Sequence, residues 1–207
     1  MLDLRAEIRG PKGALFGEQR LRLLRLERRP GPLLSEGAAS AGDALARGGL
    51  TVVYGGGKVG LMGAVADAAL DAGGRVVGVM PRALAEREIA HARLSELHVV
   101  ETMHERKATM AALADGFLAL PGGAGTLDEF FEQWTWAQLG IHGKPCGLLN
   151  VKDYFQPLLA MIEKIVAEGF MAQSYRDMLL VEPTVEALVT RFKTYSPPPR
   201  KWQAPKP

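Results

Sequence analysis

Residues 118–132 (LALPGGAGTLDEFFE) constrain the fold more than any other stretch, because they pass from an apolar run through glycines into an acidic segment. This order predicts a buried strand, a glycine loop and a helix. Glycine lets backbone N–H groups converge on an anion, and the first turn of a helix adds unpaired donors and the positive end of the helix dipole. The stretch therefore predicts a phosphate-binding loop at the end of a strand.

Asp128 and Glu129 follow this loop directly and allow two interpretations. Beside a bound phosphate, a carboxylate indicates chemistry on a phosphorylated substrate. Residues 126–129 also fit the T-x-x-E pattern of a capping box, in which Thr126 caps the helix and Glu129 accepts a bond from the N-cap amide. The spacing alone leaves both interpretations open.

Strands and helices alternate along most of the chain. Besides the strand before the central loop, we expect strands near 50–54, 75–80, 97–101, 144–150 and 178–181, and helices near 35–47, 61–72, 104–114, 127–140, 154–168 and 184–192. This alternation predicts an α/β fold of the doubly wound, Rossmann-like class, a parallel sheet with helices on both faces. In such sheets ligands bind at the carboxyl ends of the strands, where both glycine loops of this chain lie.

The 207 residues are enough for one compact domain, which we expect to span 36–195. Residues 1–35 are expected to be irregular, because Leu and Arg alternate in 21–30 without a clean strand or helix period. Residues 196–207 are rich in Pro and Lys and are expected to form a disordered tail.

Composition excludes several classes of function. The net charge is only +2, with the excess of Arg near the two ends, which argues against a nucleic-acid face. Cys146 is the single cysteine, so the chain can form no intrachain disulfide and no cysteine-based metal site, and its four histidines show no metal spacing. No apolar run approaches the roughly 20 residues that a membrane span needs, and residues 1–20 lack a signal-peptide core. We therefore expect a cytoplasmic protein that binds no membrane.

Gly55, Gly57 and Gly60 match the G-x-G-x-x-G fingerprint of dinucleotide sites. A nicotinamide site also requires an acidic residue at the end of the next strand, about 20 positions later, to bind the ribose 2′-hydroxyl. That strand ends in Val79-Met80-Pro81. A mononucleotide phosphate site is therefore favoured over an NAD site, with close packing of helix on sheet as the alternative reason for the glycines.

Arg106 and Lys107, near the start of a predicted helix, form a second candidate anion site, since Arg offers a planar fork to phosphate or carboxylate. Together with the central loop they complete a pair of motifs. Residues 121–129 fit PGGxGTxxE, and residues 103–107 fit MHxRK. Over about 42–192 the chain resembles the LONELY GUY (LOG) family, the cytokinin riboside 5′-monophosphate phosphoribohydrolases, often mislabelled as lysine decarboxylases.

The resemblance implies hydrolysis of the N-glycosidic bond of an N6-substituted adenosine 5′-monophosphate, or of AMP itself, to free base and ribose 5-phosphate. It makes Arg106 and Glu129 the catalytic pair and requires no metal or redox cofactor. The substrate- and phosphate-binding residues that it implies are Gly56, Gly57, Glu88, Lys107, Gly122, Gly123, Gly125, Thr126 and Asp128. The alternatives are a general AMP nucleosidase and a nucleotide-binding or carrier protein without turnover.

The resemblance also implies a homodimer in which the partner chain completes each site. An exposed aromatic face on the helix of Phe130 and Trp136 would suit such an interface.

The chain departs from the family at its start, where the family has a strand and a glycine- and serine-rich loop, roughly VCVYCGSSxG. One set of codons for residues 21–30, read one base later, encodes Cys-Val-Tyr-Cys-Gly-Ser-Ser-Ala-Gly. Our hypothesis is a shift of the reading frame upstream of about Ser35, which would alter the first strand and one wall of the nucleotide pocket.

Overall fold

The computed structural model describes residues 20–23, 32–87 and 90–198. Within these residues the chain forms one seven-stranded sheet in the order β4-β3-β2-β1-β5-β6-β7, and every pairing is parallel. The strands are β1 (Arg20–Leu23), β2 (Thr51–Tyr54), β3 (Val76–Pro81), β4 (Glu96–Val100), β5 (Gly116–Ala119), β6 (Cys146–Leu149) and β7 (Leu179–Glu182). The predicted doubly wound parallel sheet is confirmed.

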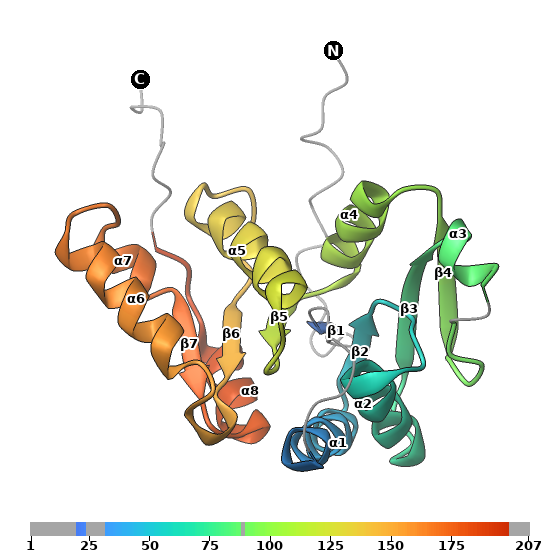
Figure 1. Ribbon diagram of the computed structural model, residues 1–207. Helices are drawn as coiled ribbons and strands as arrows, with labels where there is room; N and C mark the ends of the chain where they lie inside the picture. The colour runs from blue at the N-terminus through green and yellow to red at the C-terminus, as the bar shows by residue number, and fades with distance from the viewer. Residues whose placement is uncertain (1–19, 24–31, 88–89, 199–207) are drawn as a thin grey trace.

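Helices cover both faces of the sheet (Figure 1). One face carries α1 (Pro32–Arg47), α2 (Gly60–Asp71) and α8 (Val185–Thr194), and the other carries α4 (Met103–Leu113), α5 (Ala124–Gln138) and α6 (Gln156–Ala167). The short elements are α3 (Arg82–Ala85), α7 (Gln173–Arg176) and the 3₁₀ turn η1 (Val151–Asp153). None of the helices in the described part of the chain is long and apolar enough to cross a bilayer.

The central strands bury apolar side chains on both faces of the sheet. In β5, Phe117 and Ala119 pack under α4, α5 and α6, whereas Leu118 faces the core beneath α1, α2 and α8. Successive side chains of a strand point to opposite faces, so a strand covered on both sides is apolar throughout. This two-sided burial explains why the strands of this chain read as continuous apolar runs.

The prediction of an irregular segment over 1–35 is wrong at two places. Arg20–Leu23 form β1, which pairs with β2 and β5 in the middle of the sheet, and α1 begins at Pro32, before the predicted start at Ser35. Leu21 and Leu23 are buried on the same face, which is the two-residue period of a strand. A first strand is thus present, while most of the segment under the frame-shift hypothesis, residues 24–31, lies outside the described residues.

The capping-box interpretation of residues 126–129 is also wrong. Helix α5 begins at Ala124 with Gly123 as its N-cap, so Thr126 and Glu129 lie inside the helix. A capping box does form at the start of α4, where Thr102 Oγ1 accepts from Glu105 N at 3.1 Å and Glu105 Oε2 accepts from Thr102 N at 3.2 Å. Glu129 is therefore left for another role.

Candidate active site

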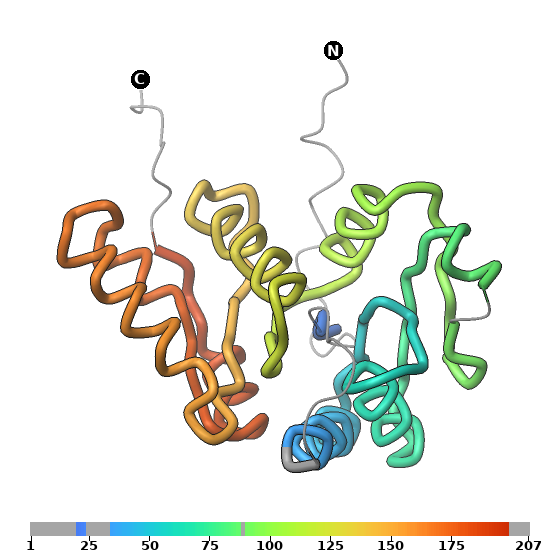
Figure 2. The backbone as a smooth tube through the Cα atoms, viewed as in Figure 1, coloured from blue at the N-terminus to red at the C-terminus, as the bar shows by residue number. Residues whose placement is uncertain are grey.

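The site lies where the order of the strands reverses. From β1 the chain builds outward through β2, β3 and β4, and it then returns to the other side of β1 to build β5, β6 and β7. In Figure 2 the blue β1 lies between these two halves. In doubly wound sheets the carboxyl ends of the strands at such a reversal form the ligand crevice. A ligand site is therefore expected among the residues that follow or flank the ends of β1 and β5.

The glycine loop after β5 leads directly into α5. Thr126 is fully buried in the first turn of that helix, and its Oγ1 has no hydrogen-bond partner among the described residues. A Cβ placed on Gly122 would collide with this hydroxyl, and the carbonyl of Gly122 accepts a bond from Tyr154 OH at 2.9 Å. A buried hydroxyl without a partner is costly, so its presence at a helix N-terminus is typical of a site that binds an anion.

Glu129, one turn farther along α5, is only 2% exposed and lies between two arginines. Its Oε1 accepts from Arg106 Nη1 at 3.2 Å, and its Oε2 accepts from Arg22 Nη2 at 3.3 Å. Arg106 is anchored in turn, since its Nε donates to the carbonyl of Val79 at 3.1 Å. The structure thus brings together Arg106 and Glu129, which the two motifs single out.

The glycine loop after β2 reaches the same cluster through Gly55. A Cβ at Gly55 would collide with Arg106 Nη2, so the close approach of this guanidinium requires glycine. Gly56 has a φ of 77°, and its carbonyl accepts from His91 N at 2.9 Å, while the carbonyl of Gly57 accepts from Tyr54 OH at 3.2 Å. Both are buried, and both carbonyls serve packing; a phosphate contact by their backbone stays a prediction.

Lys107 and Asp128, two further predicted binding residues, pair with each other. Lys107 Nζ donates to Asp128 Oδ2 at 2.8 Å and to Glu132 Oε1 at 3.4 Å, which ties α4 to α5. Burial alone lowers the pKa of Lys107, but the bond to Asp128 and the charge of Glu132 outweigh it and leave that pKa raised. The ammonium is thus kept charged by carboxylates of its own protein. Glu88 lies outside the described residues.

Arg22 is the residue of this cluster that sequence reasoning missed. Its side chain is fully buried, it donates from Nη1 to the carbonyl of Lys107 at 3.4 Å, and its guanidinium lies 5.9 Å from the centre of the Phe117 ring. Burial lowers the pKa of Arg22, and Glu129 opposes this effect. An arginine between two leucines of a central strand has to find a buried partner, which is the signal that could have revealed it.

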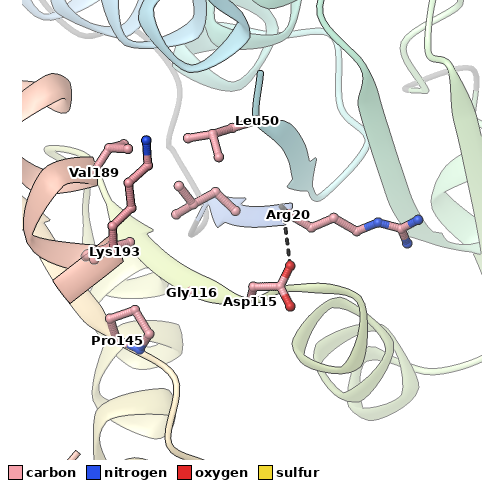
Figure 3. A pocket seen from close by; sticks show the side chains of 9 residues that line it. Arg20, Leu50, Asp115, Gly116, Pro145, Val189 and Lys193 are labelled. Carbon is pink, nitrogen blue, oxygen red and sulfur yellow. Dashed lines mark hydrogen bonds between the residues drawn. The ribbon is translucent and has the colours of Figure 1, made fainter. Parts of the chain in front are cut away.

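A separate pocket opens at the opposite, amino edge of the same strands (Figure 3). Its lining comes from the starts of β1 and β5, from Leu50 and Pro145 just before β2 and β6, and from Val189 and its neighbours in α8. There the backbone N–H of Arg20 donates to Asp115 Oδ2 at 2.9 Å. Because parallel strands place all their carboxyl ends at one edge, this pocket is remote from the Glu129 cluster.

Comparisons with known proteins show which sequences and structures this chain resembles. A family model described as possible lysine decarboxylase matches residues 62–192. A cytokinin riboside 5′-monophosphate phosphoribohydrolase of Rhodococcoides fascians is 51% identical over 158 residues, which cover 76% of this chain and 80% of the relative. The enzyme called LOG from Oryza sativa is 48% identical over 162 residues, 78% of this chain and 67% of the relative.

The fold alone is shared more widely. The molybdenum cofactor binding protein of Rippkaea orientalis superposes with a TM-score of 0.67 at 18% identity, covering 87% of this chain and 98% of that one. At this identity the likeness concerns the arrangement of strands and helices only. The family model spans both motifs, and the sequence relatives show that the chain belongs to the LOG family of cytokinin riboside 5′-monophosphate phosphoribohydrolases.

Proposed function

We propose that this protein hydrolyses the N-glycosidic bond of a cytokinin riboside 5′-monophosphate, or of AMP, to free base and ribose 5-phosphate. The observation that carries the proposal is the buried Arg106–Glu129 pair, in which Nη1 and Oε1 are 3.2 Å apart. Glu129 lies one turn of α5 after Thr126, whose hydroxyl has no hydrogen-bond partner among the described residues. An anion site and a buried carboxylate on one helix suit a substrate that carries a phosphate and reacts nearby.

The 5′-phosphate is held at the N-terminus of α5. Thr126 Oγ1 donates to it, and the backbone N–H groups of Gly122, Gly123 and Gly125 converge on it together with the positive end of the helix dipole. Hydrogen bonds to a charged group contribute about 1.5–3 kcal/mol each. Lys107 and Asp128 hold α4 and α5 at the spacing that this site needs.

In the proposed reaction, C1′ of the ribose lies beside the carboxylate of Glu129. As the bond between C1′ and the base nitrogen breaks, positive charge develops on the ribose, and a carboxylate stabilises that charge and orients the attacking water. The water oxygen bonds to C1′ and the water loses one proton, while the departing base nitrogen takes up one proton from the solvent, so the protons balance. Arg106 donates a hydrogen bond to the base side and favours its departure, while its bond to Val79 keeps the guanidinium in place.

A direct assay tests the proposal. Pure protein is incubated with AMP and with isopentenyladenosine monophosphate, and free base is followed by chromatography. Release of base from either nucleotide is the expected result. A folded sample that releases base from neither contradicts the proposal, and tight binding of AMP in that sample, measured by calorimetry, would instead favour the carrier alternative.

We also propose that the protein works as a homodimer. Phe130 and Trp134 are buried in the core, and Trp136 is half-buried against it, so the aromatic face of α5 is not the exposed surface that the sequence predicts. A better candidate lies on the edge strand β4 and the start of α4, where Leu97, Val99 and Met103 are 39%, 43% and 42% exposed. Light scattering should give twice the chain mass for the wild type and a monomer for Val99→Glu, and a monomeric wild type would contradict the proposal.

A further inference from the structure

Arg22 is held in the active site by long and incomplete contacts. Its bonds to Glu129 and to the carbonyl of Lys107 measure 3.3 and 3.4 Å, beyond the usual range for N–H···O bonds. Its Nε is buried and has no partner among the described residues. A fully buried guanidinium is therefore kept in the middle of the sheet with only part of its hydrogen-bonding capacity used.

Arg22 is not the sole cationic partner of Glu129 in the described part of the chain. Removing one partner of a buried ion pair destabilises a fold when it leaves the other charge unpaired. Glu129 keeps Arg106 as a cationic partner when Arg22 is replaced, and an apolar side chain at position 22 avoids the cost of taking a guanidinium out of water. The side chain of Arg22 points to the face of the sheet opposite Leu21 and Leu23, and the ring of Phe117 lies beside it there, so an apolar side chain at position 22 would pack against Phe117. We therefore expect Arg22 to affect the reaction at Glu129 more than the stability of the fold.

Two arginines bear on one buried carboxylate. Glu129 accepts from Arg106 on one oxygen and from Arg22 on the other, so these three described side chains together carry one positive charge in excess. Glu132 acts on Arg22 from farther away and offsets part of this excess, and it is also bonded to Lys107. A carboxylate so surrounded offers less negative charge to a cationic ribose than a carboxylate paired with Arg106 alone.

We infer that Arg22 is a positioning residue that restrains turnover by holding Oε2 of Glu129 and screening its charge. The inference rests on the proposed hydrolysis. The contacts of Arg22 are with Glu129, Lys107 and Phe117, none of which belongs to the Gly122–Thr126 loop. Removing Arg22 therefore acts on kcat and leaves binding of the 5′-phosphate, and with it KM for AMP, largely unchanged.

The experiment compares kcat and KM for AMP in the wild type, Arg22→Met and Arg22→Lys. Arg20→Met, which removes the arginine at the amino end of β1, is the matched control. Arg22→Met is expected to raise kcat about tenfold, equivalent to about 1.4 kcal/mol on the barrier, with KM within threefold of the wild type. Arg22→Lys keeps the positive charge and should show no gain, and Arg20→Met should behave like the wild type.

The double variant Arg22→Met/Glu129→Gln identifies the route of the gain. If Arg22 acts through Glu129, the gain disappears in this variant, whereas a gain that survives overturns the inference. A structural role of Arg22 would change the melting temperature without raising kcat. Arg22→Val, with a side chain suited to a buried strand, serves if the Met variant does not fold, and failure of both to fold overturns the inference.

The outcomes separate this inference from the proposed function. Wild-type hydrolysis with no gain in a folded Arg22→Met protein overturns the inference and leaves the proposed function standing. Absence of base release from every variant contradicts both. A wild type with barely measurable release and a faster Arg22→Met protein supports both.

Discussion

The two ends of the β1–β5 strand pair each place an arginine of β1 beside an acidic residue, but in opposite surroundings. At the amino end, Arg20 is partly exposed and Asp115 is exposed, and water can replace their contact. At the carboxyl end, Arg22 and Glu129 are 0% and 2% exposed, and Arg106 adds a second cation. An exposed carboxylate bound by a backbone N–H thus contrasts with a buried carboxylate bound by two guanidinium groups.

The difference decides which end can carry chemistry. A solvated carboxylate gains little from its partners, whereas a buried one depends on them, because an unpaired buried charge costs several kcal/mol. Charges in a site without water also act more strongly on a developing transition state. Substitutions at the carboxyl end should therefore alter turnover strongly, and substitutions at the amino end should barely be felt.

The largest effect is expected for Arg106→Ala. This change removes a partner of Glu129, the anchor to Val79 and the donor to the departing base, so turnover of AMP should fall about a thousandfold, near 4 kcal/mol on the barrier. Arg191→Ala, which removes an exposed arginine of α8, is the matched control and should keep wild-type kcat. An active Arg106→Ala enzyme would remove the cation from the proposed mechanism.

The second effect concerns the 5′-phosphate. Adenosine, which lacks it, should have a kcat/KM about a hundredfold below that of AMP, since one or two charge-assisted bonds of about 1.5–3 kcal/mol are lost. Steady-state rates on the two compounds measure this directly. Equal values would argue that the Gly122–Thr126 loop binds no phosphate.

A smaller effect is expected for Thr126→Val, which keeps the volume of the buried side chain but removes its unpartnered hydroxyl. We expect kcat/KM for AMP to fall about tenfold while rates on adenosine stay the same, because the hydroxyl acts on the phosphate alone. Thr135→Val, on an exposed position of the same helix, controls for loss of a hydroxyl from α5. A loss of equal size on both substrates would place Thr126 outside the phosphate site.

The smallest effect belongs to the amino end. Asp115→Asn removes an exposed carboxylate that accepts from the backbone of Arg20. Its kcat should stay within twofold of the wild type and its stability to urea within about 0.5 kcal/mol, as for most surface substitutions. A large loss of turnover here would break the contrast between the two ends of the strand pair.

Much of the fold could be predicted because apolar runs alternate with helical segments at regular spacing. The ends of the elements were less certain: α5 starts three residues before the predicted Leu127, because the glycine loop itself forms its N-cap. The failure at β1 has a physical cause. A charged residue in the middle of a four-residue strand interrupts the apolar pattern by which a buried strand is predicted. The central position of Arg20–Leu23 becomes visible only in its pairing with β2 and β5.

The site could be predicted in part. The two motifs give Arg106 and Glu129, and the structure confirms that they meet. T-x-x-E pointed equally to a helix cap, and sequence spacing could not decide, because the decision depends on where α5 begins. The motifs place Gly55 in a glycine fingerprint but do not show its close contact with Arg106, and they do not include Arg22, since both features depend on contacts between segments that lie far apart in the sequence.

The frame-shift hypothesis and the proposal about Arg22 both concern the residue at position 22. The shifted frame encodes valine where Arg22 stands, so it would remove the second cation from Glu129. Resequencing the gene tests the hypothesis. A verified, unshifted gene whose product is soluble and folded contradicts it, and the effect of Arg22 on turnover can then be measured on the native chain.

The central claim, that the buried charge of Glu129 supports the transition state, is tested most directly by Glu129→Gln. Glutamine keeps the size and much of the hydrogen bonding but removes the negative charge. The account predicts that release of base from AMP falls a hundredfold or more, about 2.7 kcal/mol on the barrier, while AMP still binds. A folded Glu129→Gln protein with wild-type turnover would contradict it and return Glu129 to a purely structural role.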